Sequence, residues 1–240
     1  MKRPASLRRP VLEAVSQDED KLVLRRPQTG RTAYRAAKRC LDVAVSATAL
    51  VLLSPVLGLA ALLVRRSSPG PVLFRQTRVG LGGQPFTMLK FRTMVDGCSD
   101  ELHRDYVQRL LDPDQPAPEP AGTVFKLEND PRLTSVGRVL RRTSVDELPQ
   151  LVNVLRGDMS LVGPRPVLPW EAALLGKEYG PRFDVPAGMT GLWQTSGRSR
   201  LTMRQALDLD LEYVRRRGML VDLVLLARTV PALLRPGDAE

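Results

Sequence analysis

The stretch RRTSVDELPQLVNVLRGDMSLVGPRP, residues 141–166, decides the fold of this chain. Its apolar side chains recur at the three- and four-residue intervals of a helix with one buried face. They are Leu148, Leu151, Val152 and Leu155. Two adjacent carboxylates, Asp146 and Glu147, stand where this helix begins, with arginines before and after them. The stretch therefore predicts an amphipathic helix that carries an acidic pair at its amino end.

The acidic pair has an interpretation that involves structure alone. Ser144 and Glu147 have the spacing of a capping box, in which the two side chains satisfy backbone N–H groups at the start of a helix. Acidic residues in a first turn also interact favourably with the helix dipole. On this interpretation Asp146 and Glu147 serve only to begin the helix.

The arginines around the pair favour a second interpretation, a phosphate site. Arg138 and Arg141 precede the pair, and Arg165 follows it between two prolines. Guanidinium groups bind phosphate oxygens in a bidentate manner and stabilise the charge that develops in phosphoryl transfer. A carboxylate near cations and a helix amino end stays ionised at neutral pH, as a nucleophile must. The surroundings therefore indicate a carboxylate that acts on phosphate.

The two carboxylates cannot perform the same task, because neighbouring helical residues point about 100° apart. One can attack phosphorus or bind a metal ion while the other orients it or moves a proton. Magnesium prefers one or two carboxylates together with phosphate oxygens, and this pair plus a substrate could supply them. The sequence contains no second acidic cluster of the kind that would form a dedicated metal site.

Composition narrows the partners. The 240 residues suffice for one hydrophobic core, and 36 Lys and Arg against 26 Asp and Glu give a net charge of +10. This balance fits nucleic acid, anionic lipid or a phosphate-bearing substrate. Aromatic residues are sparse and no nucleic-acid-binding motif is present, so nucleic acid is not expected. Cys40 and Cys98 offer neither a disulfide framework nor metal-ligand spacing, and His103 is expected at the surface.

A segment without charge, Val43–Val64, is long enough to cross a membrane, but Ser54-Pro55 interrupts it. The Ser54 hydroxyl can satisfy a backbone carbonyl that the break frees. Basic residues flank both ends of the segment, and positive charge favours the cytoplasmic side. They are Lys38, Arg39, Arg65 and Arg66. A re-entrant helix that enters and leaves by one leaflet satisfies both observations, and a kinked transmembrane anchor is the alternative.

Three regions follow from these patterns. Residues 1–32 lack an apolar segment and are predicted to form a disordered tail rather than a secretory signal. Residues 33–68 are predicted to form the re-entrant helix. Residues 69–240 are predicted to form an α/β, mostly helical catalytic domain, with a mobile loop near 112–122 and a C-terminal amphipathic helix.

A small β-hairpin is predicted on either side of Gly82-Gly83, from VLFRQTRVG (72–80) and QPFTMLKFRTM (84–94). Alternation in the second strand places Lys90 and Arg92 on one face at the strand end. These cations either guard an exposed strand edge or bind phosphate.

Taken together, these segments resemble the bacterial sugar transferase family, the monotopic polyprenol-phosphate glycosyl-1-phosphate transferases. The resemblance runs from about Ala37 to Leu234 and rests on several segments in a fixed order. They are KRCLDVAVS, the Ser54-Pro55 break, PGPVLFRQTRVG, KFRTM, the stretch from Phe125 to Pro166, and GMTGLWQTSGRS. It implies a re-entrant anchor in the bacterial inner membrane and a catalytic domain that faces the cytoplasm. It also implies transfer of a sugar-1-phosphate from a UDP-sugar to undecaprenyl phosphate, releasing UMP, as the first step of exopolysaccharide, capsule or O-antigen assembly.

The resemblance also implies roles for individual residues. Asp146 would be the nucleophile, forming a phosphosugar-aspartyl intermediate with Mg²⁺ bound beside it, and Glu147 completes the pair. The phosphate pocket would contain Lys90, Arg141 and Arg165, to which Arg92 and Arg138 are added here as further candidates. The sugar and the polymer stay open, and a homodimer is one option for the assembly.

Two departures from the family and two rival functions remain. Larger members carry several N-terminal transmembrane helices, whereas a compact form is expected here. Residues 212–230 carry arginines where the family has tryptophans, so the C-terminal helix packs either on the membrane or against the domain. Trp170 and Trp193 are expected to pack in the core or loops. The rival functions are a membrane phosphatase that uses the same aspartate and an inactive membrane-bound adaptor.

Overall fold

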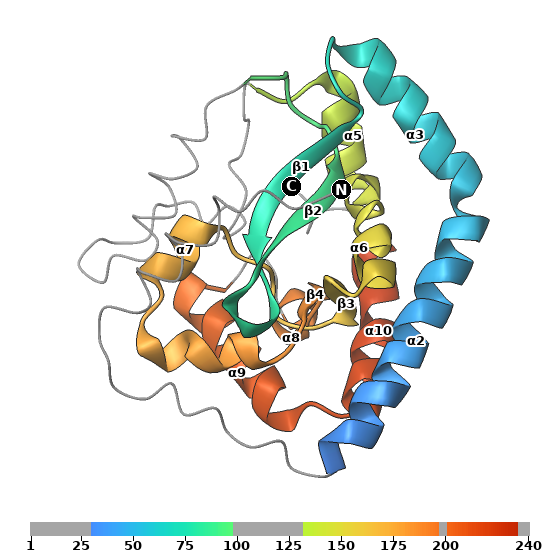
Figure 1. Ribbon diagram of the computed structural model, residues 1–240. Helices are drawn as coiled ribbons and strands as arrows, with labels where there is room; N and C mark the ends of the chain where they lie inside the picture. Colours follow the sequence, from blue (N-terminus) through green and yellow to red (C-terminus); the bar gives the residue numbers. More distant parts are fainter. Residues whose placement is uncertain (1–29, 98–131, 197–200, 235–240) are drawn as a thin grey trace, which may run out of the picture.

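The computed structural model describes residues 30–97, 132–196 and 201–234. The expected tail up to residue 29, the polar segment with Cys98 and His103, and the loop at 112–122 lie outside these residues. The described chain is mostly helical with two small sheets, which confirms the predicted class (Figure 1). The helices are α2 (Gly30–Leu52), α3 (Ser54–Ser67), α5 (Ser135–Arg142), α6 (Gln150–Arg156), α7 (Pro169–Leu174), α8 (Leu192–Thr195), α9 (Met203–Arg216) and α10 (Met219–Leu234). The strands are β1 (Leu73–Val79), β2 (Pro85–Phe91), β3 (Met159–Val162) and β4 (Ala187–Thr190).

The first sheet is the predicted hairpin. Strands β1 and β2 pair antiparallel, from Leu73 opposite Phe91 to Val79 opposite Pro85. A 3₁₀ turn, Leu81–Gly83, joins them, and both of its glycines have positive φ, at 63° and 68°. Glycine adopts this conformation without steric cost, which explains why the pair marks the turn.

The second sheet, β3 with β4, is parallel and was not predicted. It brings together two glycine-containing segments, because a Cβ on Gly188 would lie 2.1 Å from the backbone nitrogen of Gly163. The absence of side chains there lets the chain that follows β3 pass directly beside β4. That segment leads straight into Arg165.

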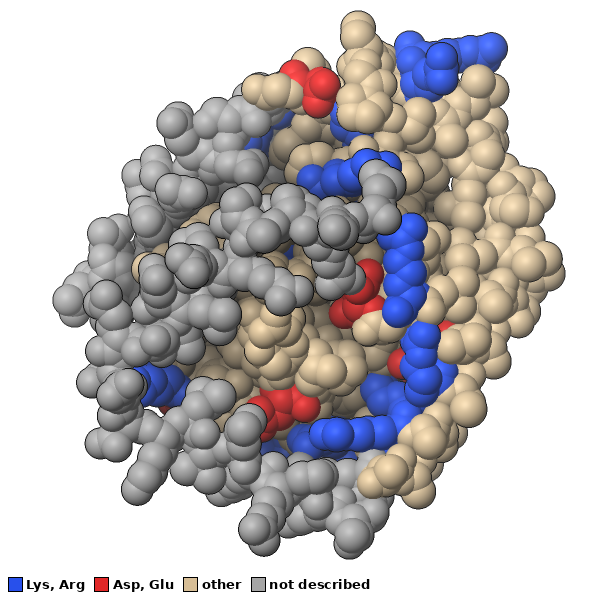
Figure 2. Space-filling view, viewed as in Figure 1, with Lys and Arg blue, Asp and Glu red and all other residues tan. Residues whose placement is uncertain are grey.

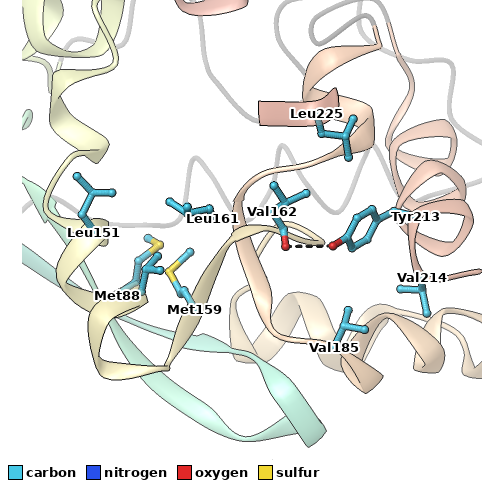
Figure 3. Close-up of a cluster of buried hydrophobic side chains, with 10 residues drawn as sticks. Met88, Leu151, Met159, Leu161, Val162, Val185, Tyr213, Val214 and Leu225 are labelled. Atoms are coloured by element: carbon cyan, nitrogen blue, oxygen red, sulfur yellow. Dashed lines mark hydrogen bonds between the residues drawn. The ribbon is translucent and has the colours of Figure 1, made fainter. Parts of the chain in front are cut away.

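The main hydrophobic core joins the hairpin to the C-terminal helices (Figure 3). It combines side chains from β2, α6, β3, α9 and α10 with Val185. Its buried members are Met88, Leu151, Val154, Met159, Leu161, Val162, Val185, Tyr213, Val214 and Leu225. Within it, the Tyr213 hydroxyl donates to the Val162 carbonyl at 3.2 Å (Figure 3). A second cluster packs α3 against β2 and α5, through Ala60, Val64, Phe91 and Leu140.

The helix pair α2–α3 forms a long bent arm along one side of the molecule (Figure 1). The break falls at Leu53, directly before the predicted Ser54-Pro55, and the Ser54 hydroxyl donates to the Val51 carbonyl at 2.8 Å, as expected. No single helix in the described part of the chain is long and apolar enough to cross a membrane. The arm meets that criterion only as a pair, bent by 64°.

Helix α2 buries polar residues and exposes apolar ones. Lys38, Asp42 and Ser46, each four residues apart, are at most 8% exposed. The large exposed side chains in the middle of the arm are apolar: Val43, Val45, Val51, Leu52, Val56, Leu59, Leu62 and Leu63. Accordingly, the edge formed by the arm is tan over most of its length (Figure 2). This pattern is the reverse of a water-facing helix and marks an interaction surface for an apolar environment.

The C-terminal helix α10 packs against α2 and the second sheet. Of the two predicted arrangements, packing on the membrane or against the domain, the second is therefore found for one face of the helix. Asp222 on that face is fully buried, whereas Leu220, Leu223 and Val224 are exposed. Trp193 is 6% exposed, as expected for core packing, and Trp170 begins α7 half-buried.

Candidate active site

The acidic pair lies in a 3₁₀ turn, Val145–Glu147, between α5 and α6 and in contact with β2. The predicted capping box is wrong. Ser144 has left-handed backbone angles, φ 55° and ψ 16°, and its side chain makes no cap hydrogen bond. Helix α6 starts only at Gln150, after Pro149. The acidic pair therefore lies in a separate 3₁₀ turn that precedes α6, and neither carboxylate is needed to cap that helix.

Within the turn, the two carboxylates have different surroundings. Glu147 accepts a hydrogen bond from Lys90 at 2.8 Å, and these side chains are 31% and 20% exposed. Asp146 is 7% exposed. Lys90 lies near the end of β2, so the ion pair joins the hairpin to the turn. The structure thus places Lys90 against the turn that carries Asp146 and Glu147, and the roles of these residues stay predictions.

Arg141 lies on the same side of the domain, at the end of α5. Its Nε donates to the hydroxyl of Thr93 at 3.0 Å, and Thr93 is 7% exposed. Thr93 lies two residues after strand β2, and the sequence analysis missed its part in orienting Arg141. Arg138 lies one turn earlier on α5 and is exposed. Basic and acidic side chains gather along the border between the arm and the centre of this face (Figure 2).

Arg92 and Lys90 bind different partners, and their common face at the strand end stays a prediction. Strand β2 ends at Phe91, but the Arg92 N–H still donates to the Val72 carbonyl at 3.0 Å, in register with the hairpin. Its guanidinium donates to the carbonyls of Ser68 and Pro69, at 2.6 and 2.8 Å, and the residue is 4% exposed. These contacts fix the chain where it leaves α3. A phosphate contact of Arg92 stays a prediction.

Arg165 is positioned by a buried ion pair that the sequence did not reveal. Arg182 Nη2 donates to the Arg165 carbonyl and to Asp210 Oδ2, each at 2.8 Å. Both members of the pair are at most 3% exposed. Burial raises the pKa of Asp210 to about 6, and the hydrogen bond and charge of Arg182 oppose that rise. No local pattern marks this pair, since its members lie 28 residues apart.

Helix α2 is fixed to this domain through its buried polar side chains. Asp222 accepts hydrogen bonds from Tyr34, Lys38 and Tyr213, each at 2.8 Å. Asp42 accepts from the Ser160 hydroxyl and the Leu161 N–H, each at 3.0 Å. The arm is therefore held at a set angle to the acidic turn.

The described residues contain no group of three or more His, Cys, Asp or Glu side chains that could hold a metal ion by themselves. The turn offers two carboxylates, of which Glu147 already pairs with Lys90. Asp146 therefore suits Mg²⁺ only when substrate phosphate oxygens and water complete the coordination, which is the usual arrangement for this ion.

Comparison with known proteins identifies the family. Residues 33–236 match the model of the family described as bacterial sugar transferase. The exopolysaccharide production protein ExoY of Rhizobium meliloti is 42% identical over 197 residues, which cover 82% of this chain and 85% of that protein. The UDP-glucose:undecaprenyl-phosphate glucose-1-phosphate transferase of Caulobacter vibrioides is 43% identical over 218 residues, 87% of this chain and 74% of that protein.

A third relative is longer. The undecaprenyl-phosphate galactose phosphotransferase of Salmonella typhimurium is 39% identical over 205 residues, 85% of this chain and 42% of that protein. The matched region includes the acidic turn, the hairpin and the arm. This chain belongs to the bacterial sugar transferase family and is a phosphoglycosyl transferase.

Proposed function

We propose that this enzyme transfers a sugar-1-phosphate from a UDP-sugar to undecaprenyl phosphate. The products are an undecaprenyl-diphosphate sugar and UMP, and the reaction begins the assembly of an exopolysaccharide, capsule or O-antigen-type glycan. The names of the relatives support the substrates. The observation that carries the proposal is the acidic turn held against Lys90.

The reaction proceeds in two displacements at one phosphorus atom. A carboxylate oxygen of Asp146 attacks the sugar-bearing phosphorus of the UDP-sugar, the bond to the bridging oxygen breaks, and UMP leaves. A phosphate oxygen of undecaprenyl phosphate then attacks the same phosphorus and releases Asp146. Covalent catalysis suits these substrates, because the water-soluble nucleotide can leave before the lipid phosphate attacks.

The charges of the pocket divide the remaining tasks. Lys90 and Arg141 would stabilise charge on the transferred phosphoryl group, and Arg165 would bind the diphosphate. Glu147 keeps Lys90 in place through its ion pair. Magnesium held by Asp146 and the diphosphate oxygens would neutralise charge on the leaving phosphate.

The bent arm would enter the cytoplasmic leaflet of the bacterial inner membrane and leave by the same side. Its support is the outward apolar surface of the arm, the break at Leu53 and the basic residues at both ends. Residues 33–68 then form the anchor and residues 69–240 the catalytic domain. The lipid substrate lies in the same leaflet, so the anchor holds the acidic turn near its phosphate.

One assay separates this function from its rivals. Detergent-solubilised protein is incubated with Mg²⁺ and labelled UDP-glucose or UDP-galactose, with and without undecaprenyl phosphate. The transferase gives labelled lipid, and sustained UMP release only when the lipid is present. A phosphatase or hydrolase gives free sugar phosphate without lipid, and an adaptor gives no product. Asp146→Asn should abolish turnover, whereas the exposed control Asp184→Asn should retain it.

The direction of the arm is tested by cysteine labelling in intact cells. With Cys40 and Cys98 replaced, cysteines are introduced at Arg35 near the start of the arm and at Arg66 near its end. A re-entrant arm leaves both positions unreactive to an impermeant external reagent. Labelling of the Arg66 position alone would instead show a transmembrane span.

A further inference from the structure

Asn153 of α6 is fully buried, and its amide is bonded on both sides. Its Oδ1 accepts the N–H of Leu89 at 3.0 Å, and its Nδ2 donates to the carbonyl of Thr87 at 2.7 Å. A third, longer contact joins Nδ2 to Asp158 at 3.3 Å. Asn153 is thus a fully buried polar side chain beside the core residues Leu151 and Val154, and its role in the fold requires an explanation.

The two backbone partners are neighbours on one edge of β2. In a strand, the carbonyl of one residue and the N–H two residues later point to the same side, where an adjacent strand would pair with them. Here the side-chain amide of Asn153 occupies that place, since β2 pairs with β1 along its other edge. A primary amide has both the acceptor and the donor that a strand's peptide group would supply.

This contact connects the two halves of the acidic site. Leu89 immediately precedes Lys90 on β2, and Asn153 lies on the helix that directly follows the turn of Asp146 and Glu147. The opposite end of α6 is held as well, because Arg39 of α2 donates to the carbonyls of Val154 and Leu155. The helix beside the acidic turn is thus fixed to the hairpin by Asn153 and to the arm by Arg39.

We propose that Asn153 is a positioning residue for phosphoryl transfer, which sets β2 against α6 so that Lys90 meets the acidic turn. This inference rests on the proposed function. Apolar contacts alone would leave the strand free to shift, because Met88, Leu151 and Val154 pack between the two elements without directional bonds. The hydrogen bonds of Asn153 define the position along the strand.

The effect on catalysis follows from the small tolerance of group transfer. A misplacement of about 1 Å at reacting groups can lower the rate about 10²-fold. Asn153→Leu keeps the branched shape of the side chain, although leucine is larger, and removes both bonds. Asn153→Asp keeps the acceptor for Leu89 but loses the donor to Thr87. Val154→Ala, on the same helix and equally buried, removes apolar contact without touching the edge of β2.

The test measures kcat, substrate KM and thermal unfolding for these three variants. We expect Asn153→Leu to lower kcat about 10- to 100-fold with little change in KM. Asn153→Asp should lower kcat at least as much, because it places a buried carboxylate against the Thr87 carbonyl and Asp158. Val154→Ala should lose thermal stability while keeping kcat near wild type. Equal kcat for folded Asn153→Leu and Val154→Ala would overturn the proposal.

A second readout does not depend on turnover. A zero-length carbodiimide joins a lysine to a carboxylate only when they touch, so the Lys90–Glu147 crosslink reports their contact by mass spectrometry. We expect it in wild type and Val154→Ala, and a several-fold lower yield in Asn153→Leu. An undiminished crosslink in Asn153→Leu would contradict the positioning role even in an enzyme without transferase activity. Absence of wild-type turnover would contradict the proposed function alone.

Discussion

Two of the ion pairs among the described residues have contrasting surroundings, Lys90–Glu147 beside the acidic turn and Arg182–Asp210 beside Arg165. Both have nitrogen–oxygen distances of 2.8 Å, but the first is 20% and 31% exposed and the second 2% and 3%. The two ion pairs therefore have the same nitrogen–oxygen distance but differ in how far water can reach their side chains. An exposed pair can exchange its partner for a substrate phosphate at small cost, and a buried pair cannot. The first pair suits catalysis, and the second suits the fixing of a neighbouring residue.

The largest effect should come from breaking the buried pair. Arg182→Met leaves Asp210 buried without its partner, at a cost of about 3–5 kcal/mol. For a chain of this size that lowers Tm by about 10 °C or more in a thermal unfolding scan. The double variant Arg182→Met/Asp210→Leu removes both charges and should recover most of the loss. A small effect of Arg182→Met would mean that water reaches the pair.

Breaking the exposed pair, Lys90–Glu147, should lower activity strongly and stability only slightly. Lys90→Met removes a cation from the phosphate pocket and should lower kcat/KM about 10²-fold. Its Tm should change by little, because exposed pairs contribute less than about 1 kcal/mol. Lys90→Arg, which keeps the charge, is the matched control and should retain more activity. A large drop in Tm with unchanged kcat/KM would give this pair a structural role instead.

The two pairs should also differ in their response to pH. Burial raises the pKa of Asp210 to about 6 from its ordinary 3.8. A carboxyl group with a raised pKa in the folded state stabilises that state most at low pH, and the contribution is lost as pH rises through the folded pKa. The Tm of wild type relative to Asp210→Asn should therefore fall between about pH 4 and pH 7. A difference that stays constant would show that Asp210 titrates as an ordinary surface carboxyl.

The smallest effect is expected from a third pair, which is exposed but far from any proposed substrate. Arg216 and Glu212 lie four residues apart on α9, with side chains 74% and 37% exposed. Arg216→Gln should change the free energy of unfolding by less than about 0.5 kcal/mol and leave turnover intact. A loss of turnover in this variant would mean that exposure of an ion pair does not by itself predict which variants affect catalysis.

Features encoded by neighbouring residues were predictable from the sequence. Gly82-Gly83 marked the hairpin turn, and Ser54-Pro55 marked the break of the arm, because both depend on local backbone preferences. The acidic pair and Lys90 were identified together, and the structure brings them into one site.

Features that depend on distant partners were not predictable. Ser144 fits a capping box by spacing, but the surrounding packing places it in a left-handed conformation. No local pattern marks the contact of Asp222 with Lys38, because the two residues lie 184 positions apart. The role of Asn153 could not be predicted from neighbouring residues, because its hydrogen-bond partners on the edge of β2 lie more than 60 residues earlier. Such contacts depend on the tertiary structure, and no periodic pattern of residues in the sequence indicates them.

The most direct test of the account is to trap the covalent intermediate. Enzyme mixed with Mg²⁺ and a UDP-sugar, without lipid, is quenched in acid, and the peptide that contains Asp146 is analysed by mass spectrometry. The account predicts a burst of UMP and a phosphosugar adduct on Asp146 that disappears when undecaprenyl phosphate is added. Full transfer to lipid by Asp146→Asn, with no adduct in wild type, would contradict it.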